Sequence, residues 1–359
     1  MLKRFVCVVL FSIACGSVSA ETAATSADFV PPLDEYDWVQ LDSGEWLKGE
    51  LQSLYDDELV FDSDNLGLLR IDWEDVIRFR GHGTHAVGVG GSEVKVGALW
   101  VDADRLVVSR DDIKYEMSRE QLVSITRSVS RERDRWSGDI AFGVNVREGN
   151  SDIVEFNSIV GLERRTPVTR ALLDYFGSIN RTDGEEIENN HRVNVAFDRF
   201  NDSQWFWRPF FGQYFRDPFQ NIKHQATLET GVGNEIVDTS RTEWNVSGGL
   251  GFNFLRYDSV EIGKDSSNTS PALSLGTDFE TEVTDWMDYL LVFQMTFLDE
   301  ASGAYQHHLL TTLSTDLIGD LDLDVSLVWD RTQKPQTRAD GSVPEKDDYR
   351  LIFGLAYEF

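Results

Sequence analysis

Large apolar residues alternate with small or charged residues through the C-terminal two-thirds of the chain, and this period of two restricts the fold more than any other feature. In segment 349–359, for example, one face carries large apolar residues (Tyr349, Leu351, Phe353, Leu355, Tyr357 and Phe359), and the other carries mostly charged or small ones (Arg350, Gly354, Ala356 and Glu358). Successive side chains of a β-strand point to opposite faces. Each such segment therefore predicts a strand with one apolar and one polar face.

Segments of this kind follow one another without interruption: 136–148, 153–164, 169–180, 191–200, 204–216, 222–235, 241–257, 271–282, 287–298, 305–317, 321–331 and 349–359. Each has about the 9–11 residues that a tilted strand needs to cross the hydrocarbon layer. Tight turns, such as 201–203 and 318–320, alternate with longer polar loops expected at 181–190, 258–270 and 332–348. Outer-membrane barrels have this asymmetry and an even number of strands. The sequence thus predicts an all-β protein with a transmembrane antiparallel β-barrel of about 12 strands over 136–359.

A soluble β-sandwich is the alternative, because it also alternates apolar and polar positions. The segments are longer than the 5–6 residues usual in globular sheets, however. The connections also alternate in length, and the chain ends on Phe359 after Tyr357. These features favour the membrane barrel.

The first 20 residues have the layout of a signal peptide. Lys3 and Arg4 precede an apolar stretch over 5–14 that is too short to span a bilayer, and small residues lead to a cleavage site after Ala20. We expect 1–20 to be removed and 21–33 to be disordered. No later segment has the ~20 consecutive apolar residues of a transmembrane helix.

The two cysteines, Cys7 and Cys15, both lie in this leader. A chain cleaved after Ala20 would therefore have no disulfide and no cysteine-bound metal. A lipoprotein site at Cys15 is the alternative, but Ser12 stands where such a site needs an apolar residue.

Composition narrows the partners. The formal net charge is -29, so the chain has no excess of positive charge for nucleic acid, and we expect no nucleic-acid partner. It is rich in aromatic residues, with 22 Phe, 10 Trp and 10 Tyr. Abundant aromatics suit a barrel with interfacial girdles, such as the one expected from Trp205-Phe206-Trp207 at the start of a strand.

Residues 34–127 predict shorter strands in two similar copies, 34–80 and 85–127. Gly49 matches Gly97, and Trp73 matches Met117. Neither copy has enough apolar positions for a large core, so we expect the copies to stack or pair. The strand spacing resembles two tandem Sm-like small β-barrels, which we expect in the periplasm.

A linker over 128–135 follows the second copy. Together with Arg127 it places four arginines just before the first membrane strand: Arg127, Arg131, Arg133 and Arg135. They are either part of a solvated linker or a contact to lipid phosphates.

Several stretches of 136–359 carry a family resemblance: Trp136-Ser137-Gly138, residues 147–152, residues 182–185, Asp198-Arg199-Phe200 and residues 354–359. On these the barrel half resembles the salt-induced outer membrane protein family, a barrel domain of unknown function. The resemblance implies an outer-membrane barrel and supplies no catalytic residues. In proteins that this chain resembles, the barrel insertion machinery recognises a terminal aromatic strand, so we expect that machinery as a partner through Phe359.

Histidines are the natural candidates for catalysis or metal binding: His82, His85, His191, His224, His307 and His308. A hydrolase needs a Ser–His or Asp–His set, and His191 and His224 both lie near the expected outer rim. Neighbours on a strand point to opposite faces, so His307 and His308 would not share a metal. His82 and His85 border a turn between the two copies, with no third ligand evident. We therefore assign no catalytic, cofactor-binding or metal-binding residue and expect no cofactor.

Acidic residues crowd the expected outer loops: Asp183, Glu185, Glu186, Glu188, Asp258, Glu261, Asp265, Asp340, Glu345, Asp347 and Asp348. They either keep the surface solvated or bind divalent cations that bridge to lipopolysaccharide. By parity the lumen is also acidic, with Asp139, Asn145, Glu155, Asn194, Asp198, Glu229, Asn245, Asp278, Glu280, Asp322, Asp324 and Arg350 facing inward. A conducting lumen of this kind would favour cations, whereas pairing with lumen arginines would close it.

The prediction is an outer-membrane barrel with its N-terminal domain in the periplasm. We expect a narrow channel or an envelope-integrity protein, linked to salt or osmotic conditions through the family name alone, and not an enzyme. The alternatives are an outer-membrane enzyme acting on lipid and a non-conducting scaffold that presents the periplasmic module. The expected partners are outer-membrane lipid, lipopolysaccharide and a periplasmic protein.

Overall fold

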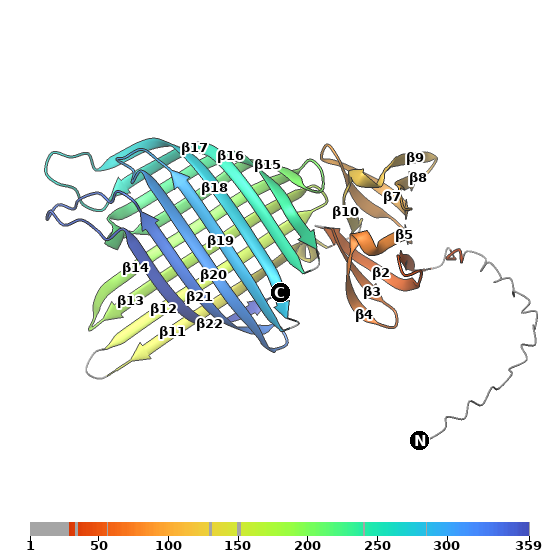
Figure 1. Cartoon of the computed structure of the whole chain (residues 1–359), viewed down its shortest axis with the longest axis horizontal. Coiled ribbons are helices and arrows are strands. Elements are labelled where there is room, and N and C mark those ends of the chain that lie inside the picture. Colours follow the sequence, from red (N-terminus) through yellow and green to blue (C-terminus); the bar gives the residue numbers. More distant parts are fainter. Residues whose placement is uncertain are drawn as a thin grey trace, which may run out of the picture. The chain divides into compact units, whose positions relative to one another are not determined.

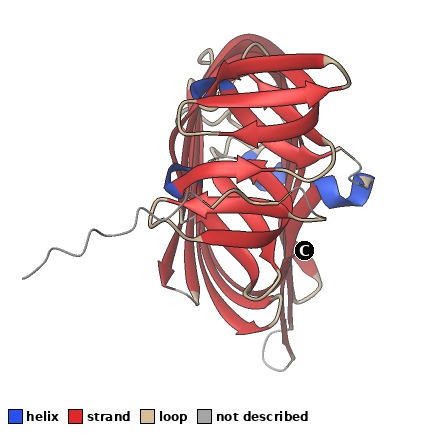
Figure 2. Ribbon diagram, turned by 90° about the vertical axis from the view of Figure 1, so that its right-hand side faces the viewer, coloured by secondary structure: helices blue, strands red, loops and turns tan. Residues whose placement is uncertain are grey.

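The structure is a computed structural model that describes residues 29–32, 35–55, 57–128, 131–148, 152–239, 241–284 and 286–358. Within these residues nearly all regular structure is strand, and helix is limited to short 3-10 segments (Figure 2). Those segments are η1 (Trp73–Asp75), η2 (Arg119–Gln121), η3 (Glu132–Arg135) and η4 (Pro218–Gln220). In this part of the chain no helix is both long and apolar enough to cross a membrane.

A small closed barrel forms the N-terminal module. Its strands are β1 (Asp37–Leu41), β2 (Trp46–Tyr55), β5 (Val76–Arg80), β6 (His85–Val89), β7 (Glu93–Val101) and β10 (Leu122–Arg127). They pair in the order β1-β5-β7-β6-β10-β2, and β2 pairs with β1 to close the ring. Two hairpin extensions complete the module, because β3 (Glu58–Ser63) and β4 (Gly67–Asp72) continue from β2, and β8 (Arg105–Arg110) and β9 (Ile113–Ser118) continue from β7.

The two sequence repeats do not form the two small barrels expected, because they build this one barrel together. Each contributes three of its six strands, and β5–β7 and β10–β2 are the pairings that join the repeats. A single core results, in which residues of both repeats, such as Leu51, Phe61, Leu99 and Val108, are at most 2% exposed. Neither repeat has the apolar area to fill a barrel alone, so sharing one core solves the problem that the sequence poses.

Equivalent glycines mark the repeat. A Cβ atom on Gly49 would lie 2.1 Å from the carbonyl oxygen of Asp62, and one on Gly97 would lie 2.4 Å from that of Ser109. Both positions therefore require glycine because two strands approach closely. The equivalent of Trp73 is Arg119, however, since each directly follows a six-residue strand. The expected match of Trp73 with Met117 is thus shifted by two residues.

A closed antiparallel barrel of twelve strands forms the C-terminal part (Figure 1). Its strands are β11 (Trp136–Arg147), β12 (Ile153–Thr166), β13 (Thr169–Thr182), β14 (Glu185–Phe200), β15 (Trp205–Asp217), β16 (Ile222–Thr239), β17 (Thr242–Tyr257), β18 (Ser267–Thr284), β19 (Met287–Phe297), β20 (Tyr305–Ile318), β21 (Leu321–Thr332) and β22 (Asp347–Glu358). Each strand pairs with the next in sequence, and β11 pairs with β22 to close the ring. The predicted fold class and strand number are confirmed.

Short connections gather at one end of this barrel, which we call the turn end, and most longer connections gather at the other, the loop end. The turn end includes 167–168 and 319–320, and the loop end includes 258–266 and 333–346. The expected loop over 181–190 is instead almost entirely strand. Asp183 and Gly184 alone make its turn, with φ angles of 53° and 82°. Two successive positive φ values are those of a type I′ hairpin turn, which an Asp-Gly pair forms readily.

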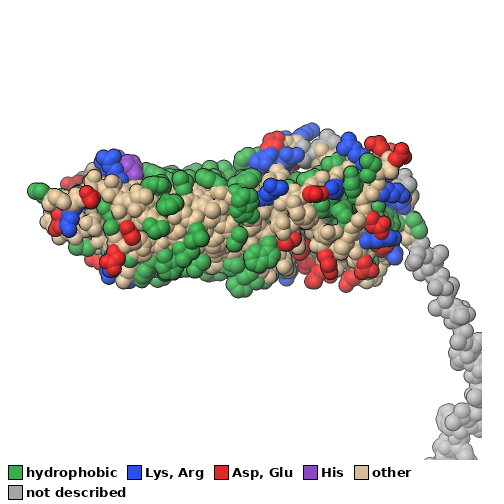
Figure 3. Space-filling view, turned by 90° about the horizontal axis from the view of Figure 1, so that it is seen from above, with side chains coloured by type: hydrophobic (Ala, Val, Ile, Leu, Met, Phe, Trp, Pro, Cys, Tyr) green, Lys and Arg blue, Asp and Glu red, His purple; other side chains and the backbone are tan. Residues whose placement is uncertain are grey.

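The outer surface of the barrel is apolar. Outward-facing Leu250, Phe252, Leu351 and Phe353 are 58–64% exposed, and on the face shown in Figure 3 hydrophobic side chains are spread along the mid-section of the barrel. Exposed apolar surface of this extent is unfavourable in water and favourable in lipid. This surface therefore spans a membrane.

Several predictions lie outside the described residues. They are the signal peptide over 1–20, most of the segment 21–33 and the terminal Phe359.

Candidate functional site

The lumen of the large barrel is the candidate functional site, and at the turn end its side chains form a charged layer. Arg170 on β13 bonds Asp198 at 3.3 Å and reaches Glu235 on β16 at 3.1 Å. Arg208 holds the other oxygen of Asp198 at 2.6 Å. Asp198 is 0% exposed, and two guanidinium groups compensate its buried charge. These contacts join the neighbouring strands β13, β14 and β15.

A cavity of about 100 Å³ lies on the next level, toward the middle of the barrel. Its charged lining residues are Asp174, Glu229, Asp278 and Arg208. Asp174 is exposed to the lumen, and Glu229 accepts a hydrogen bond of 2.7 Å from the Ser274 hydroxyl. The carboxylates outnumber the guanidinium by three to one, so the cavity has a negative potential.

Apolar side chains cross the lumen beyond this cavity. Phe176 on β13 packs with Val328 on β21 and Ile352 on β22, and Ile159 and Leu310 pack against the group. Val328 is 0% exposed and Ile352 is 6% exposed. Side chains therefore fill the lumen at this level, as they do in small barrels.

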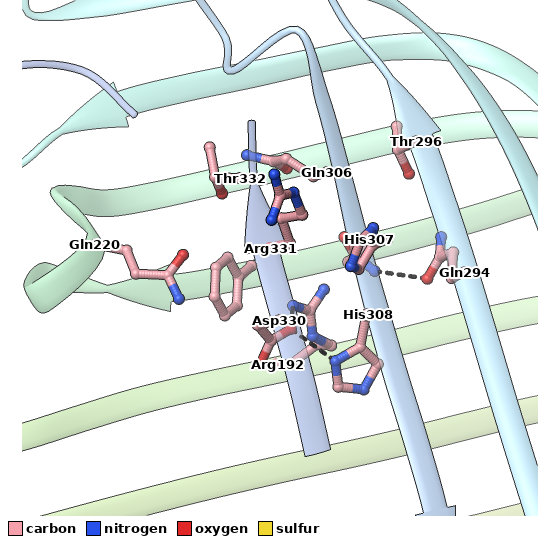
Figure 4. A pocket seen from close by; sticks show the side chains of 12 residues that line it. Arg192, Gln220, Gln294, Thr296, Gln306, His307, His308, Asp330, Arg331 and Thr332 are labelled. Atoms are coloured by element: carbon pink, nitrogen blue, oxygen red, sulfur yellow. Dashed lines mark hydrogen bonds and ion pairs between the residues drawn. The ribbon is translucent and has the colours of Figure 1, made fainter. Parts of the chain in front are cut away.

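Asp330 is the centre of a charged cluster on the loop-end side of the apolar group. It accepts hydrogen bonds of 2.7 Å from Arg192 on β14 and 2.7 Å from Nδ1 of His308 on β20, and it also pairs with Arg350. Figure 4 shows Arg192 and His308 directed toward Asp330. Arg350 also reaches Glu188 at 3.4 Å. This cluster joins strands from opposite sides of the barrel, and Asp330 is only 3% exposed.

Glutamine side chains make further bridges over the same height of the barrel. Gln213 on β15 donates to Gln294 on β19 at 3.0 Å, and Gln225 on β16 donates to Gln306 on β20 at 2.8 Å. The space left between Arg192, Gln213, Gln294 and Asp330 is only about 20 Å³, roughly the room for one water molecule. Side chains thus narrow the lumen here.

The inward orientation of the acidic residues named from the sequence is confirmed. Asp198, Glu229 and Asp324 are at most 8% exposed, whereas the residues that precede them (Phe197, Leu228 and Leu323) are 40–48% exposed on the outer surface. Sequence reasoning missed the partners of these residues. Arg170, Arg192 and Arg208 share the inward parity of their strands, and this parity could have identified them. Which carboxylate each arginine binds depends on contacts across the barrel.

The histidines are distributed over both surfaces. His191 and His224 face outward, with Nδ1 at 3.0 Å from the Tyr175 hydroxyl and at 2.8 Å from the Tyr214 hydroxyl, respectively. His307 faces outward against Trp329, whereas His308 faces the lumen. The prediction that these two neighbours point to opposite faces is confirmed.

The turn between the two repeats does not bring His82 and His85 together as a site. His85 is 2% exposed, and its Nε2 lies 3.7 Å from Asp37, while the backbone N–H of His82 donates to the same carboxylate at 2.5 Å. Within the part of the chain that the structure describes, no group of three His, Cys, Asp or Glu residues is arranged to hold a metal ion.

Several acidic residues of the expected outer loops pair with arginines. Glu186 lies 3.8 Å from Arg181, and Asp347 lies 2.6 Å from Arg331. In the linker, Arg135 lies 3.4 Å from Glu132, which also accepts a hydrogen bond of 2.6 Å from Arg164. This bond from Arg164 lowers the pKa of Glu132. These local pairs account for part of the charge that the sequence places there.

Trp205 and Trp207 lie on the outer surface near the turn end and are 52% and 51% exposed, whereas Phe206 between them is 2% exposed and faces inward. Indole rings at this height favour the headgroup region of a bilayer. Their positions agree with the expected aromatic girdle.

A closed antiparallel barrel with an apolar outer band, aromatic rims and a polar interior is a transmembrane β-barrel of the outer-membrane type. The chain belongs to the family described as "Protein of unknown function, DUF481", which matches residues 140–359. That description states neither an activity nor a link to salt.

The sequence matches none of the curated proteins. Among solved structures it is similar to the NanC porin, with 10% identity over 62% of this chain and 100% of that chain and a TM-score of 0.38. It is also similar to the translocator domain of the autotransporter NalP from Neisseria meningitidis (10% identity, 62% of this chain and 87% of that chain, TM-score 0.35). A third similar structure is the outer membrane channel DcaP of Acinetobacter baumannii (8% identity, 79% of this chain and 95% of that chain, TM-score 0.28). These likenesses are too low to transfer a function.

Proposed function

We propose that this protein is a narrow, cation-preferring channel of the outer membrane, with its small six-stranded barrel in the periplasm, and that its lumen is closed in the state described here. The observation that carries the proposal is the arrangement of the lumen. A negative cavity lies beside a constriction that consists only of side chains.

The carboxylates of the lumen support the preference for cations. Asp139, Asp174 and Glu280 face the lumen and are exposed on the turn-end side of the constriction, and the cavity there holds three carboxylates and one guanidinium. Rings of acidic side chains favour cations over anions in pores. Anions entering from the turn end would meet this potential before they reached the constriction.

The lumen is closed by side chains, which can move without a change in the strands. Inside the barrel the contacts that bridge the lumen are made by side chains such as Arg192, Asp330, Phe176 and Gln213. At the loop end, the segment 333–346 also reaches across to Asn221 and Ser259. Side chains change rotamer far more readily than a barrel rearranges its strands. A path therefore opens if Arg192 and Phe176 swing away from their partners.

Single-channel recording in a planar bilayer tests the proposal. The refolded wild type should be silent or open rarely. Arg192→Ala removes the side chain that reaches Asp330 across the lumen and should give steady cation-selective steps. Arg199→Ala is the matched control, because Arg199 is on the same strand and exposed on the outer face, and it should behave as the wild type.

A second pair of substitutions tests the selectivity. In the Arg192→Ala background, Asp174→Asn with Asp278→Asn should reduce the preference for cations over anions. Steady wild-type conductance would contradict the closure. Silence in every variant, with each shown to be folded, would reject the channel.

A non-conducting scaffold is the second candidate, and the free edges of the small barrel favour it. Among the described strands, β4 pairs only with β3, and β9 pairs only with β8, so each presents unpaired backbone groups to a partner strand. Leu68 and Ile113 on these edges are 61% and 57% exposed. This candidate predicts that Leu68→Pro with Ile113→Pro abolishes the protein's function in cells, whereas Arg192→Ala leaves it intact.

A further inference from the structure

Basic side chains form a row on the outer surface of the large barrel, just beyond the apolar band at the loop end. The row consists of His191 on β14, Arg216 on β15, Lys223 and His224 on β16, and Arg256 on β17. We call it the basic rim patch. Its members are neighbours across adjacent strands, since His191 pairs with Arg216 and His224 pairs with Arg256.

A bulge in β16 completes the row. Phe215 lies opposite Gln225, and Asp217 lies opposite Ile222, so both Lys223 and His224 lie opposite Arg216. The extra residue is the typical consequence of a β-bulge, which brings one more side chain to the same height. Two cationic side chains and an imidazole therefore converge at this one step of the barrel.

The patch faces lipid and not the lumen. Arg256 has the same parity as Phe252 and Phe254, which are 59% and 44% exposed on the outer surface. His224 likewise follows Leu228 on the outward face of β16, where Leu228 is 48% exposed. The step from apolar to basic residues marks the height at which hydrocarbon gives way to headgroups. On the face seen in Figure 3, histidine and basic side chains lie together toward this end of the barrel.

The cations of the patch have no carboxylate partner among the described residues. Among the residues that the structure describes, Lys223 and Arg256 form no ion pair and are exposed. Arg216 donates only to the neutral side-chain oxygen of Asn189, at 2.6 Å. The chain has a net charge of -29, and other arginines near the loop end, such as Arg181 and Arg331, lie beside carboxylates. A group of cations without carboxylate partners is therefore unusual in this protein.

Each of the two histidines of the patch contacts a tyrosine hydroxyl through one ring nitrogen. The Tyr214 hydroxyl lies 2.8 Å from Nδ1 of His224, and the Tyr175 hydroxyl lies 3.0 Å from Nδ1 of His191. An imidazole that accepts the tyrosine hydroxyl at Nδ1 carries its proton at Nε2. In that tautomer the Nε2–H is the group that is left to donate to an anion in the headgroup region.

From this arrangement we propose that the basic rim patch binds the phosphate group of a lipid headgroup in the leaflet at the loop end. Guanidinium and ammonium groups are the side chains that recognise phosphate, and they bind it most strongly where water is partly excluded. The patch opens sideways, flush with the apolar band, so its ligand is a phosphate carried by a lipid. A free phosphate ion would gain nothing from the apolar surface below.

The experiment measures binding of a diphosphorylated glycolipid (lipid A) to the full-length protein refolded in detergent, by native mass spectrometry. Lys223→Gln with Arg256→Gln removes the two unpaired cations and should weaken binding about tenfold or more, since each removes a charge-assisted hydrogen bond. Arg147→Gln with Lys334→Gln is the matched control. It removes two cations near the loop end outside the patch and should change binding less than about twofold.

Further arms identify the ligand. Dephosphorylated glycolipid should bind about as weakly as the double variant binds lipid A, and inorganic phosphate at the same concentration should not displace the bound lipid. Lys223→Arg with Arg256→Lys keeps both charges and should retain most of the binding, which separates lost charge from lost folding. Equal binding by the wild type and Lys223→Gln/Arg256→Gln, equal binding of the dephosphorylated lipid, or displacement by free phosphate would each overturn the proposal.

Discussion

Asp330→Asn removes the one negative charge on which two arginines and a histidine converge inside the lumen. The asparagine keeps the shape and one acceptor oxygen, so strand geometry should be preserved. Arg350 retains Glu188 at 3.4 Å, but Arg192, whose side chain is 11% exposed, loses the carboxylate it contacts at 2.7 Å. The substitution therefore leaves a buried guanidinium without the carboxylate that it contacts.

The size of the effect follows from this burial. Removing one partner of a buried ion pair costs about 3–5 kcal/mol, most of which is the uncompensated charge left behind. Because the amide oxygen still accepts one hydrogen bond, we expect the lower end, about 3 kcal/mol. Asp324→Asn is the matched control on the same strand, since Asp324 is 8% exposed and its oxygen accepts a hydrogen bond from the Ser314 hydroxyl. It should lose about 1 kcal/mol.

The assay is urea unfolding of the barrel refolded into lipid vesicles, with the folded fraction read from gel mobility without boiling. The free energy of unfolding should fall in the order wild type, Asp324→Asn, Asp330→Asn. Equal losses in the two variants would refute the argument. They would show that the contacts of Asp330 with two arginines and a histidine stabilise the barrel no more than the hydrogen bond of Asp324 does.

Three further predictions concern the fold. The folded protein should migrate faster unboiled than boiled on a gel, and an unchanged mobility would count against the barrel. Leu250→Arg, on the lipid face, should cost about 2–4 kcal/mol, whereas Asn145→Arg, on the lumen face, should cost little; equal losses in vesicle unfolding would show that the two faces are wrongly assigned. In the small barrel, Gly49→Ala and Gly97→Ala should each cost about 1–3 kcal/mol, because the new Cβ would overlap a carbonyl oxygen, and tolerance of either by the purified protein in thermal unfolding would contradict the close approach of the strands.

The large barrel could be predicted from sequence because its signal is local. The parity of Leu351, Phe353 and Leu355 along one strand is readable without knowing which strand lies beside it. The same locality explains the error over 181–190. Charged residues there suggested a loop, whereas the Asp183-Gly184 turn lets the strands continue beyond the membrane, where polar residues on both faces meet water.

The small barrel was harder to predict because its closure depends on strand pairings between the two repeats, which are distant in sequence. Each repeat shows its own strands, and Gly49 and Gly97 mark the period. Whether two repeats close two barrels or share one depends on pairings such as β5–β7, where Phe79 lies opposite Val101 across the repeat boundary. Nothing within one repeat specifies such a partner.

The lumen was predicted as acidic, and its closure was left open for the same reason. Parity identifies Asp330 and Arg192 as inward residues, but their contact joins β21 to β14 across the barrel. That contact depends on the curvature and height of the wall. The sequence gives the length and the charge of each side chain, but it does not give the distance between opposite walls of the barrel.

Thiol accessibility tests the closed lumen most directly, because the chain has no cysteine after residue 15. Asp174→Cys places a thiol on the turn-end side of the constriction, and Asn145→Cys places an exposed one near the loop end. A charged, membrane-impermeant reagent applied to the loop-end side should modify Asn145→Cys quickly and Asp174→Cys slowly, and Arg192→Ala should make the second reaction fast. Rapid modification of Asp174→Cys without Arg192→Ala, or no acceleration with it, would contradict the account.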